Sequence, residues 1–216
     1  MLSALPVLVP LAAFLALFIK AVSPGPVLFR QTRIGHRGRR FTCLKFRTMF
    51  QGAETQVHEE HCRRLIQQGA PLAKLDGQKD PRIIPGGRFL RLLGLDELPQ
   101  LVNVWRGEMS LVGPRPCVPA EFDRSSPAQH RRLEALPGIT GLWQVRGKNT
   151  TTFVRMIELD LEYIEKRCPA VDCGILLRTP AVIVAECARA VRRCLDPDRA
   201  SNATISQPAP SARARA

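Results

Sequence analysis

The N-terminal segment is the longest uninterrupted hydrophobic stretch in the chain. Met1 to Ile19 carry no charge and consist mainly of Leu, Ala, Val and Phe, and Lys20 follows directly. As one helix this stretch would extend roughly 28 Å, close to the thickness of the hydrocarbon core of a bilayer. Pro6 and Pro10 would each remove a helical hydrogen bond and bend the helix. We therefore expect a membrane-associated helix over residues 1–22.

Three interpretations of this helix compete. A secretory signal peptide would begin with positive residues and end at a cleavage site of small residues, and neither feature is present. A helix that spans the bilayer would have to tolerate two prolines. A proline-kinked, re-entrant helix, which enters and leaves the membrane on the same face, uses the prolines directly, and we favour it.

Periodic patterns predict the elements that follow. Two segments on either side of a turn look like short strands, and helical spacing predicts several helices. The strands are expected at 27–31 and 41–49, joined by a turn at 35–40, and the helices at 52–71, 89–93, 153–166 and 172–195, the last interrupted at Pro180. Gly and Pro mark 110–116 and 137–147 as loops. Residues 196–216 lack any apolar period and are expected to be disordered. The pattern predicts an α+β fold, mostly helical, with amphipathic helices at the membrane interface and a small compact domain at 23–195.

One helix has a sharper pattern than the others. Leu98, Leu101, Val102 and Trp105 are spaced i, i+3, i+4 and i+7, as on the buried face of an amphipathic helix. Asp96 precedes them and is a candidate for the N-cap. We expect this helix to form part of the core.

Charge narrows the choice of partners. The 216 residues include 32 Lys and Arg against 19 Asp and Glu, a formal net charge of +13. This excess favours anionic partners such as phosphate esters, nucleic acid or an acidic membrane surface. Aromatic residues are sparse at 6%, and no nucleic-acid-binding module is visible, so we do not expect nucleic acid. The mean hydropathy of −0.07 excludes a protein with many membrane spans.

A basic band directly follows the hydrophobic segment. Residues 20–50 contain eight cations and no acid: Lys20, Arg30, Arg33, Arg37, Arg39, Arg40, Lys45 and Arg47. A band of this kind marks the cytoplasmic side of a membrane segment and is attracted to anionic lipid. For the group at 37–40, a solvated basic loop is an equally good interpretation.

Adjacent carboxylates at Asp96 and Glu97 are the strongest candidates for chemistry. Taken alone, they would be interpreted as a helix cap and a first-turn acid. Several arginines surround them in the sequence: Arg82, Arg88, Arg91, Arg106 and Arg115. Nearby cations keep carboxylates ionised, and an ionised carboxylate suits nucleophilic attack or metal binding. Arginines and Mg²⁺ neutralise a phosphate during its transfer, so the cluster favours phosphoryl transfer.

Two Gly- and Pro-rich loops offer further candidates. Gly113-Pro114-Arg115-Pro116 is a rigid loop that presents one guanidinium, or simply a tight turn with a solvated arginine. Pro137 to Val145 place Trp143 and Gln144 beside a glycine turn. These side chains would suit a nucleotide base, and packing explains them equally well.

Taken in order, these segments are similar to those of the bacterial sugar transferase family, the monotopic polyprenyl-phosphate phosphoglycosyl transferases that begin exopolysaccharide, capsule and glycoprotein glycan assembly. The matching strings are SPGPVLFRQTRIG (23–35), KFRTM (45–49), DPRI (80–83), LDELPQLVNVWRGEMSLVGPRP (95–116), PGITGLWQVRGKN (137–149) and ELDLEYIE (158–165). The longest string is too specific to arise by chance.

The resemblance implies a membrane-anchored enzyme that moves a sugar-1-phosphate from a UDP-sugar to polyprenyl (undecaprenyl) phosphate and releases UMP. It implies that Asp96 is the nucleophile, forms a covalent phosphosugar intermediate and binds Mg²⁺, with Glu97 as its partner. It assigns substrate binding to Arg91, Arg115, Lys45, Arg47, Arg88, Gln144 and Asp160. It also implies a bacterial inner membrane location with the catalytic domain on the cytoplasmic face. A homo-oligomer is an open alternative to a monomer.

The chain departs from the family pattern at three places. Nine residues precede Pro10, fewer than family members carry before the helix break, so the entering half of the re-entrant hairpin is mostly missing from this sequence; either the true start lies upstream or the protein anchors differently. Leu93-Gly94 stand where small hydroxyl residues are usual before the dyad, and Arg146 replaces a residue that is commonly small or an amide. These departures motivate an alternative, a catalytically inactive membrane-bound scaffold in a polysaccharide assembly complex.

Overall fold

The computed structural model describes residues 5–52, 80–123, 126–147 and 151–195. Helices predominate within these ranges, as predicted, and two small sheets accompany them. The strands are β1 (Leu28–Ile34), β2 (Arg40–Phe46), β3 (Ser110–Val112) and β4 (Gly138–Thr140). The α-helices are α1 (Leu5–Val22), α3 (Gly87–Leu93), α4 (Gln100–Trp105), α5 (Pro119–Phe122), α6 (Pro127–His130), α7 (Leu142–Gly147), α8 (Phe153–Lys166) and α9 (Pro169–Leu195). Single 3₁₀ turns form η2 (His36–Gly38), η4 (Leu95–Glu97) and η5 (Arg131–Glu134). Nearly all of the helix predicted at 52–71, and the whole tail at 196–216, fall outside the described ranges.

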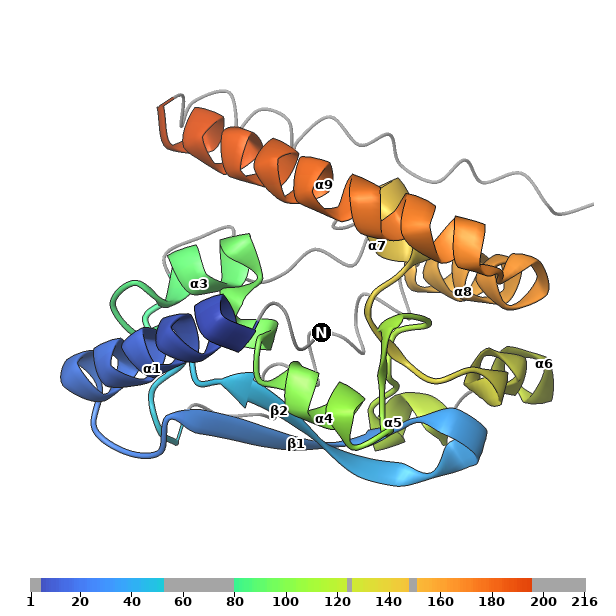
Figure 1. Ribbon diagram of the computed structural model, residues 1–216, viewed down its shortest axis with the longest axis horizontal. Helices are drawn as coiled ribbons and strands as arrows, with labels where there is room; N and C mark the ends of the chain where they lie inside the picture. The colour runs from blue at the N-terminus through green and yellow to red at the C-terminus, as the bar shows by residue number, and fades with distance from the viewer. Residues whose placement is uncertain (1–4, 53–79, 124–125, 148–150, 196–216) are drawn as a thin grey trace, which may run out of the picture.

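The predicted pair of strands is confirmed as an antiparallel hairpin of β1 and β2. Its register runs from Leu28 opposite Phe46 to Ile34 opposite Arg40. The turn between the strands is tight, and Arg37 adopts a left-handed conformation there with φ 53°. Figure 1 shows this hairpin along one edge of the molecule and α9 along the opposite edge.

Helix α1 packs against the domain along one side. Leu15 and Ile19 are buried in a cluster with residues of β2, α3 and the segment before α3. The other side exposes large apolar side chains, among them Phe14 and Leu17, which are 65% and 72% exposed. The helix continues through Pro10. Among the described residues, no helix meets the length and hydropathy required to cross a membrane.

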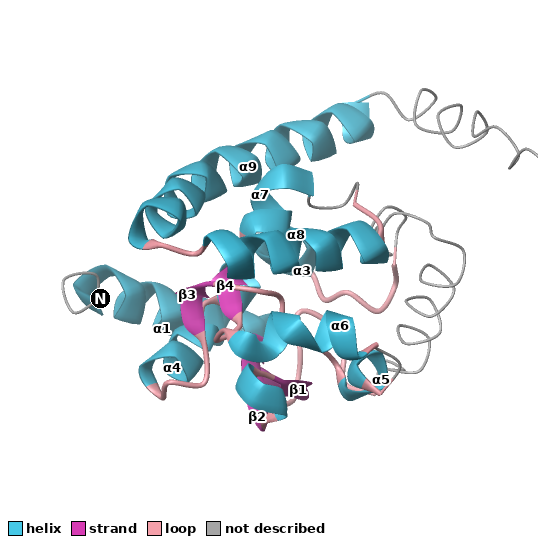
Figure 2. Cartoon of the chain, turned by 90° about the vertical axis from the view of Figure 1, so that its right-hand side faces the viewer, coloured by secondary structure: helices cyan, strands magenta, loops and turns pink. Residues whose placement is uncertain are grey.

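The second sheet was not predicted, because both of its strands lie in segments interpreted as loops. β3 and β4 pair in parallel, with Ser110 opposite Gly138 and Val112 opposite Thr140. A side chain at Gly138 would place its Cβ 2.1 Å from the backbone nitrogen of Gly113, so only glycine permits this close approach. The three-residue strands are too short to show alternation, which is why the pattern missed them. Figure 2 shows this pair between the hairpin and helices α7 and α9.

The C-terminal helices cover the β3–β4 pair. Leu142 of α7, Leu159 of α8 and Ile175 of α9 share one buried cluster with Val112 of β3. The predicted interruption of the last helix at Pro180 is wrong: α9 begins at Pro169 and continues through Pro180. One proline removes a single helical hydrogen bond, and α9 is held by contacts with α3, α7, β3 and β4.

Candidate active site

The carboxylate pair lies in a sharp turn between two short helices. Gly94 ends α3 in a left-handed conformation with φ 70°, and the 3₁₀ turn η4 carries Asp96 and Glu97 directly after it. The prediction that Asp96 caps the following helix is wrong, because Pro99 occupies the N-cap position of α4. Asp96 is only 8% exposed. The turn therefore keeps the Asp96 carboxylate largely buried, and Asp96 does not cap a helix.

The predicted buried face of α4 is confirmed only in part. Leu98 packs against the cluster of Leu15 and Ile19, but Trp105 is 84% exposed and the buried residues of the helix are Gln100 and Asn103. Asn103 explains the burial of the polar side: its Oδ1 accepts from the Leu44 backbone N–H at 3.1 Å, and its Nδ2 donates to the Thr42 carbonyl at 2.8 Å. These two bonds satisfy backbone groups of β2, so the polar side of α4 faces the hairpin. Asn103 thus fixes the position of the dyad turn relative to β2.

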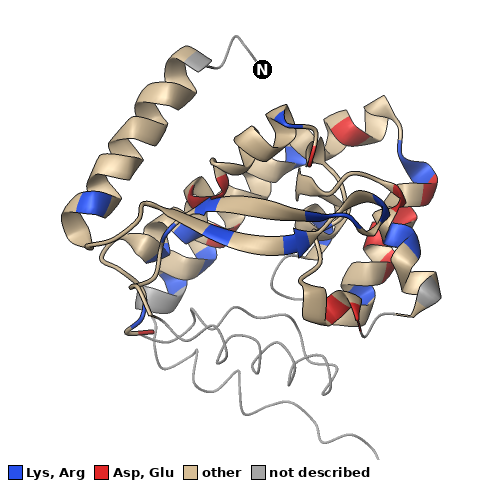
Figure 3. Cartoon of the chain, turned by 90° about the horizontal axis from the view of Figure 1, so that it is seen from below, with Lys and Arg blue, Asp and Glu red and all other residues tan. Residues whose placement is uncertain are grey.

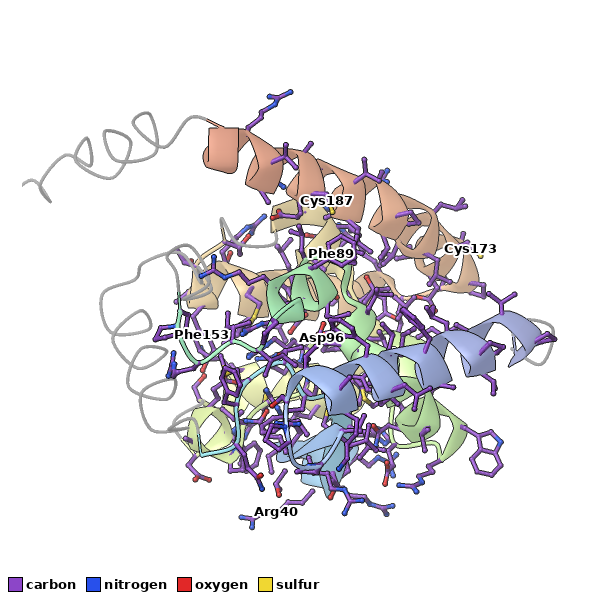
Figure 4. All side chains as sticks on the ribbon, turned by 90° about the vertical axis from the view of Figure 1, so that its left-hand side faces the viewer. Arg40, Phe89, Asp96, Phe153, Cys173 and Cys187 are labelled. Atoms are coloured by element: carbon purple, nitrogen blue, oxygen red, sulfur yellow. The ribbon has the colours of Figure 1, made fainter. Side chains whose placement is uncertain are left out.

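A large cleft opens beside Asp96, with a volume of about 1230 Å³. Its walls come from the start of the hairpin, the end of β2 with the residues after it, and the region of α3. The lining residues are 26–31, Arg33, 45–52, Arg82, Arg91 and Asp96. Among these described lining residues, six are cations and Asp96 is the single carboxylate. Figure 3 shows Lys and Arg positions along both strands of the hairpin, and in Figure 4 Asp96 lies near the centre of the molecule.

Lys45 connects the hairpin to the dyad. Its Nζ forms an ion pair with Oε1 of Glu97 at 2.8 Å, and both side chains are 28% exposed. Lys45 also lines the cleft. The pair therefore orients Glu97 while remaining open to solvent and to a ligand.

Arg82 and Arg91 bring positive charge to the same cleft. Asp80 accepts bonds from Nε and Nη2 of Arg82 at 2.9 and 2.8 Å, a bidentate arrangement that fixes the guanidinium. The bond from Arg82 lowers the pKa of Asp80 to about 2. The DPRI string thus encodes an arginine held in place by the aspartate two residues before it.

Arg47 borders the cleft, but its donors are directed to the turn after α1. Nε donates to the Pro26 carbonyl at 2.6 Å, Nη1 to Ser23 Oγ at 2.8 Å and Nη2 to the Ser23 carbonyl at 2.9 Å. Arg47 is 5% exposed and Ser23 is 1% exposed. This placement favours an anchoring role for Arg47 over the predicted contact with substrate.

The remaining predicted site residues do not line the cleft. Asp160 is buried in an ion pair with Arg132, whose Nη2 lies 2.8 Å from its Oδ2, and the two side chains are 1% and 2% exposed. Burial raises the pKa of Asp160 to about 6, although Arg132 opposes the shift. Gln144 donates to the Ile139 carbonyl at 3.1 Å, and Arg88 lies on the exposed side of α3. These placements favour structural or surface roles for the three residues.

Arg115 lies behind the cleft in the loop after β3. Its Nη1 contacts both carboxylate oxygens of Glu121 at 3.0 and 3.2 Å. Nη2 of Arg132 donates to its backbone carbonyl at 2.7 Å, so the buried Arg132–Asp160 pair supports the loop that carries Arg115.

Comparison with known proteins gives the family. The sequence model described as "Bacterial sugar transferase" matches residues 1–186. The chain belongs to the bacterial sugar transferase family. The predicted family and enzyme class, a phosphoglycosyl transferase, are thereby confirmed.

Several curated sugar transferases and related proteins are similar over most of the chain. The exopolysaccharide production protein ExoY of Rhizobium meliloti is 39% identical over 180 residues, which are 82% of this chain and 78% of that protein. The UDP-glucose:undecaprenyl-phosphate glucose-1-phosphate transferase of Caulobacter vibrioides is 43% identical over 82% of this chain and 64% of its own length. The undecaprenyl-phosphate galactose phosphotransferase of Salmonella typhimurium is 38% identical, and the match covers 74% of this chain and 34% of that protein.

Three cleft residues of this sugar transferase were not singled out as site residues from its sequence. Arg30, Gln31 and Arg33 line the cleft from β1. The sequence contained a signal for two of them: in the hairpin register, Gln31 and Arg33 fall on the same face as Lys45. That signal requires the register, which the sequence pattern did not supply.

The site's fit to Mg²⁺ rests on the donors at Asp96 and Glu97. No group of three or more His, Cys, Asp or Glu suited to a metal occurs within the described ranges. Mg²⁺ does not require such a cage, since it is commonly held by one or two carboxylates together with substrate phosphates and water. Asp96, the single carboxylate among the described lining residues of a cleft with six cations, fits a magnesium ion that arrives with a phosphate substrate.

Proposed function

We propose that the chain transfers a sugar-1-phosphate from a UDP-sugar to undecaprenyl phosphate and releases UMP, as the first membrane step of polysaccharide or glycoconjugate assembly. One observation carries the proposal: Asp96 is the single carboxylate among the described lining residues of a cleft with six cations. The names of the relatives in Caulobacter vibrioides and Salmonella typhimurium support the same reaction class.

Asp96 acts as the nucleophile in this proposal. A carboxylate oxygen of Asp96 attacks the β-phosphorus of the UDP-sugar, and the bond from that phosphorus to the bridging oxygen breaks, so that UMP leaves with the electron pair. An oxygen of undecaprenyl phosphate then attacks the same phosphorus, and the bond to Asp96 breaks. The products are a polyprenyl diphosphate sugar and the original carboxylate.

The surrounding cations serve both steps. Arg82 and Arg91 face the phosphates and offset the charge that develops on the transferred group. Lys45 holds Glu97 beside the nucleophile. Mg²⁺, held by Asp96 with Glu97 nearby, would neutralise diphosphate charge when bound.

The character of α1 and the basic band at residues 20–50 support membrane association in this proposal. The exposed side of α1 carries Val7, Phe14 and Leu17, and a patch of that kind is typical of a lipid-facing surface. The cations of residues 20–50 would meet anionic lipid heads at the cytoplasmic face of the bacterial inner membrane. In this arrangement the membrane-borne phosphate of undecaprenyl phosphate reaches the cleft from the lipid surface.

The test is a donor-only half-reaction with the full chain in detergent. UMP is measured from a panel of UDP-sugars with Mg²⁺ and without lipid acceptor, comparing wild type with Asp96→Asn. We expect a stoichiometric release of UMP from the wild type, labelling of the protein with phosphosugar, and neither from the variant.

The acceptor and the metal are tested in the same assay. Addition of undecaprenyl phosphate should convert the single release into repeated turnover, and EDTA should suppress both. No UMP release with any panel member would contradict the proposed reaction and favour the scaffold. Turnover retained by Asp96→Asn would contradict the role of the nucleophile.

A further inference from the structure

One face of the β1–β2 hairpin points toward both the dyad turn and the loop that carries Arg115. In the register, Phe29, Gln31 and Arg33 lie opposite Lys45, Cys43 and Phe41, and these six residues share one face. Lys45 reaches Glu97 from this face, and Arg33 reaches the carbonyl of Pro116 with its Nη1 at 3.0 Å. Arg33 is four residues, about 13 Å, along β1 from the position opposite Lys45.

The guanidinium of Arg33 is held in place by neutral oxygens. Nε and Nη2 both donate to Oε1 of Gln31, at 3.0 and 2.7 Å. Together with the Pro116 carbonyl, these bonds fix the plane of the guanidinium. An arginine has five N–H donors, these bonds use three of them, and Arg33 is also a lining residue of the cleft.

The charges around Arg33 leave a positive excess. Burial lowers the pKa of Arg33 to about 10, and the positive charge of Arg115 adds to the shift. Glu121 is the carboxylate near both arginines: its burial would raise its pKa, but Arg115 and Arg33 hold the pKa below its usual value. Arg132 is matched by Asp160. Two arginines therefore share one carboxylate in a partly buried place, which is an environment that favours an anion.

We propose that Arg33, oriented by Gln31, binds a phosphate group of the substrate in the cleft lined by Asp96, with Arg115 supporting the site through its charge. The inference rests on the function proposed above and adds a second phosphate contact at a distance from the dyad. The phosphate belongs either to the nucleotide donor or to the lipid acceptor, since both carry the same chemistry.

The test compares Arg33→Gln with wild type as full chains in detergent. Binding of UDP is measured by calorimetry, and the KM for undecaprenyl phosphate is measured in the complete reaction. We expect one of the two constants to rise about tenfold to a hundredfold, the effect of losing a charged hydrogen bond. A weaker UDP affinity assigns the nucleotide phosphate, and a higher KM for the lipid assigns the lipid phosphate.

Two further variants separate binding from folding. Arg33→Lys keeps the charge without the fixed guanidinium plane, so its affinity should fall between those of wild type and Arg33→Gln at an unchanged melting temperature. Arg155→Gln removes the same charge from the exposed face of α8, where Arg155 pairs with Glu158, and should leave both constants unchanged.

The outcomes distinguish this inference from the function on which it rests. Unchanged UDP affinity and unchanged KM in an active Arg33→Gln protein would overturn the assignment of Arg33 alone. A lower melting temperature of Arg33→Gln with unchanged UDP affinity and KM would show that Arg33 only stabilises the loop at Pro116. A wild type that neither binds UDP nor turns over would overturn the proposed function and this inference together.

Discussion

Two ion pairs in this protein contain predicted active-site residues: Lys45 pairs with Glu97, and Asp160 pairs with Arg132. The two pairs differ completely in their exposure to solvent. Lys45 and Glu97 meet at 2.8 Å at the cleft, each with 28% of its side chain exposed. Arg132 and Asp160 meet at the same distance in the core, with 2% and 1% exposed. The exposed Lys45–Glu97 pair is able to rearrange around a ligand, whereas the buried Arg132–Asp160 pair is fixed by its surroundings. Exposure, which no motif encodes, separates the pair suited to chemistry from the pair that supports the fold.

The largest effect on activity is expected for a substitution of Asp96, with little effect on stability. Asp96→Asn should lower sugar-phosphate transfer at least about a thousand-fold, because an amide cannot form the phosphosugar bond. Its thermal stability in detergent should remain within about 1 kcal/mol of wild type. UMP release and a melting curve measure the two effects, and a large loss of stability would show that Asp96 also supports the fold.

Asp160 should show the opposite behaviour. Asp160→Ala leaves the buried Arg132 without its carboxylate and should cost about 3–5 kcal/mol of unfolding free energy. Asp160→Asn should cost less than Asp160→Ala, because the amide keeps the volume of the side chain and leaves a polar group beside Arg132. Replacing both partners with apolar residues, Arg132→Met with Asp160→Leu, should recover part of the loss. A double variant less stable than Asp160→Ala would contradict this account.

The pH dependence of stability gives an independent test of the buried Arg132–Asp160 pair, with a smaller expected effect. The pKa of Asp160 is raised from 3.8 to about 6 by burial, so between these values the folded chain holds a proton that the unfolded chain has released. Its contribution to stability is therefore complete below pH 4 and decreases as pH rises through 6, by at most about 3 kcal/mol. Unfolding titrations of wild type and Asp160→Asn should differ by this slope. Parallel curves would contradict the raised pKa.

Lys45 should give the smallest effect on stability. Lys45→Gln removes a partly exposed ion pair and should change stability by less than about 1 kcal/mol. Transfer should fall about tenfold, because Glu97 loses the contact that orients it beside Asp96, the proposed nucleophile. Lys45→Arg keeps the charge and should recover part of the rate. Equal rates for wild type and Lys45→Gln would remove Lys45 from the site.

The sequence was sufficient to predict those features of the fold and the site that depend on residues close together in the chain. Two strand-like segments at 27–31 and 41–49 with a turn between them were enough to predict the hairpin, and the arginines before Asp96 were enough to predict a cationic site. The orientation of α4 depends on Asn103 and its two bonds to β2, whose partners lie 59 and 61 residues away in the sequence. Apolar spacing favoured the side with Trp105, and only the distant backbone of β2 shows why the polar side is buried.

The roles of individual charged residues could not be predicted from the sequence either. Arg47 and Arg91 follow similar motif evidence in the sequence, but Arg47 is committed to Ser23 and Pro26 in the fold. The short strands β3 and β4 were missed because pairing between Val112 and Thr140 leaves no local pattern. The carboxyl groups of Asp96 and Asp160 differ in role through the elements packed around them.

The bonds from Arg47 to the turn after α1 have a mechanical consequence. Three donors of one guanidinium join the end of α1 to a wall of the cleft, and both Arg47 and Ser23 are buried. A rigid link of this kind does not allow the helix to swivel independently of the catalytic pocket. Whatever surface supports α1, the link keeps Asp96 at a constant height above that surface, and in the proposed reaction a phosphate carried there would meet Asp96 at a set depth.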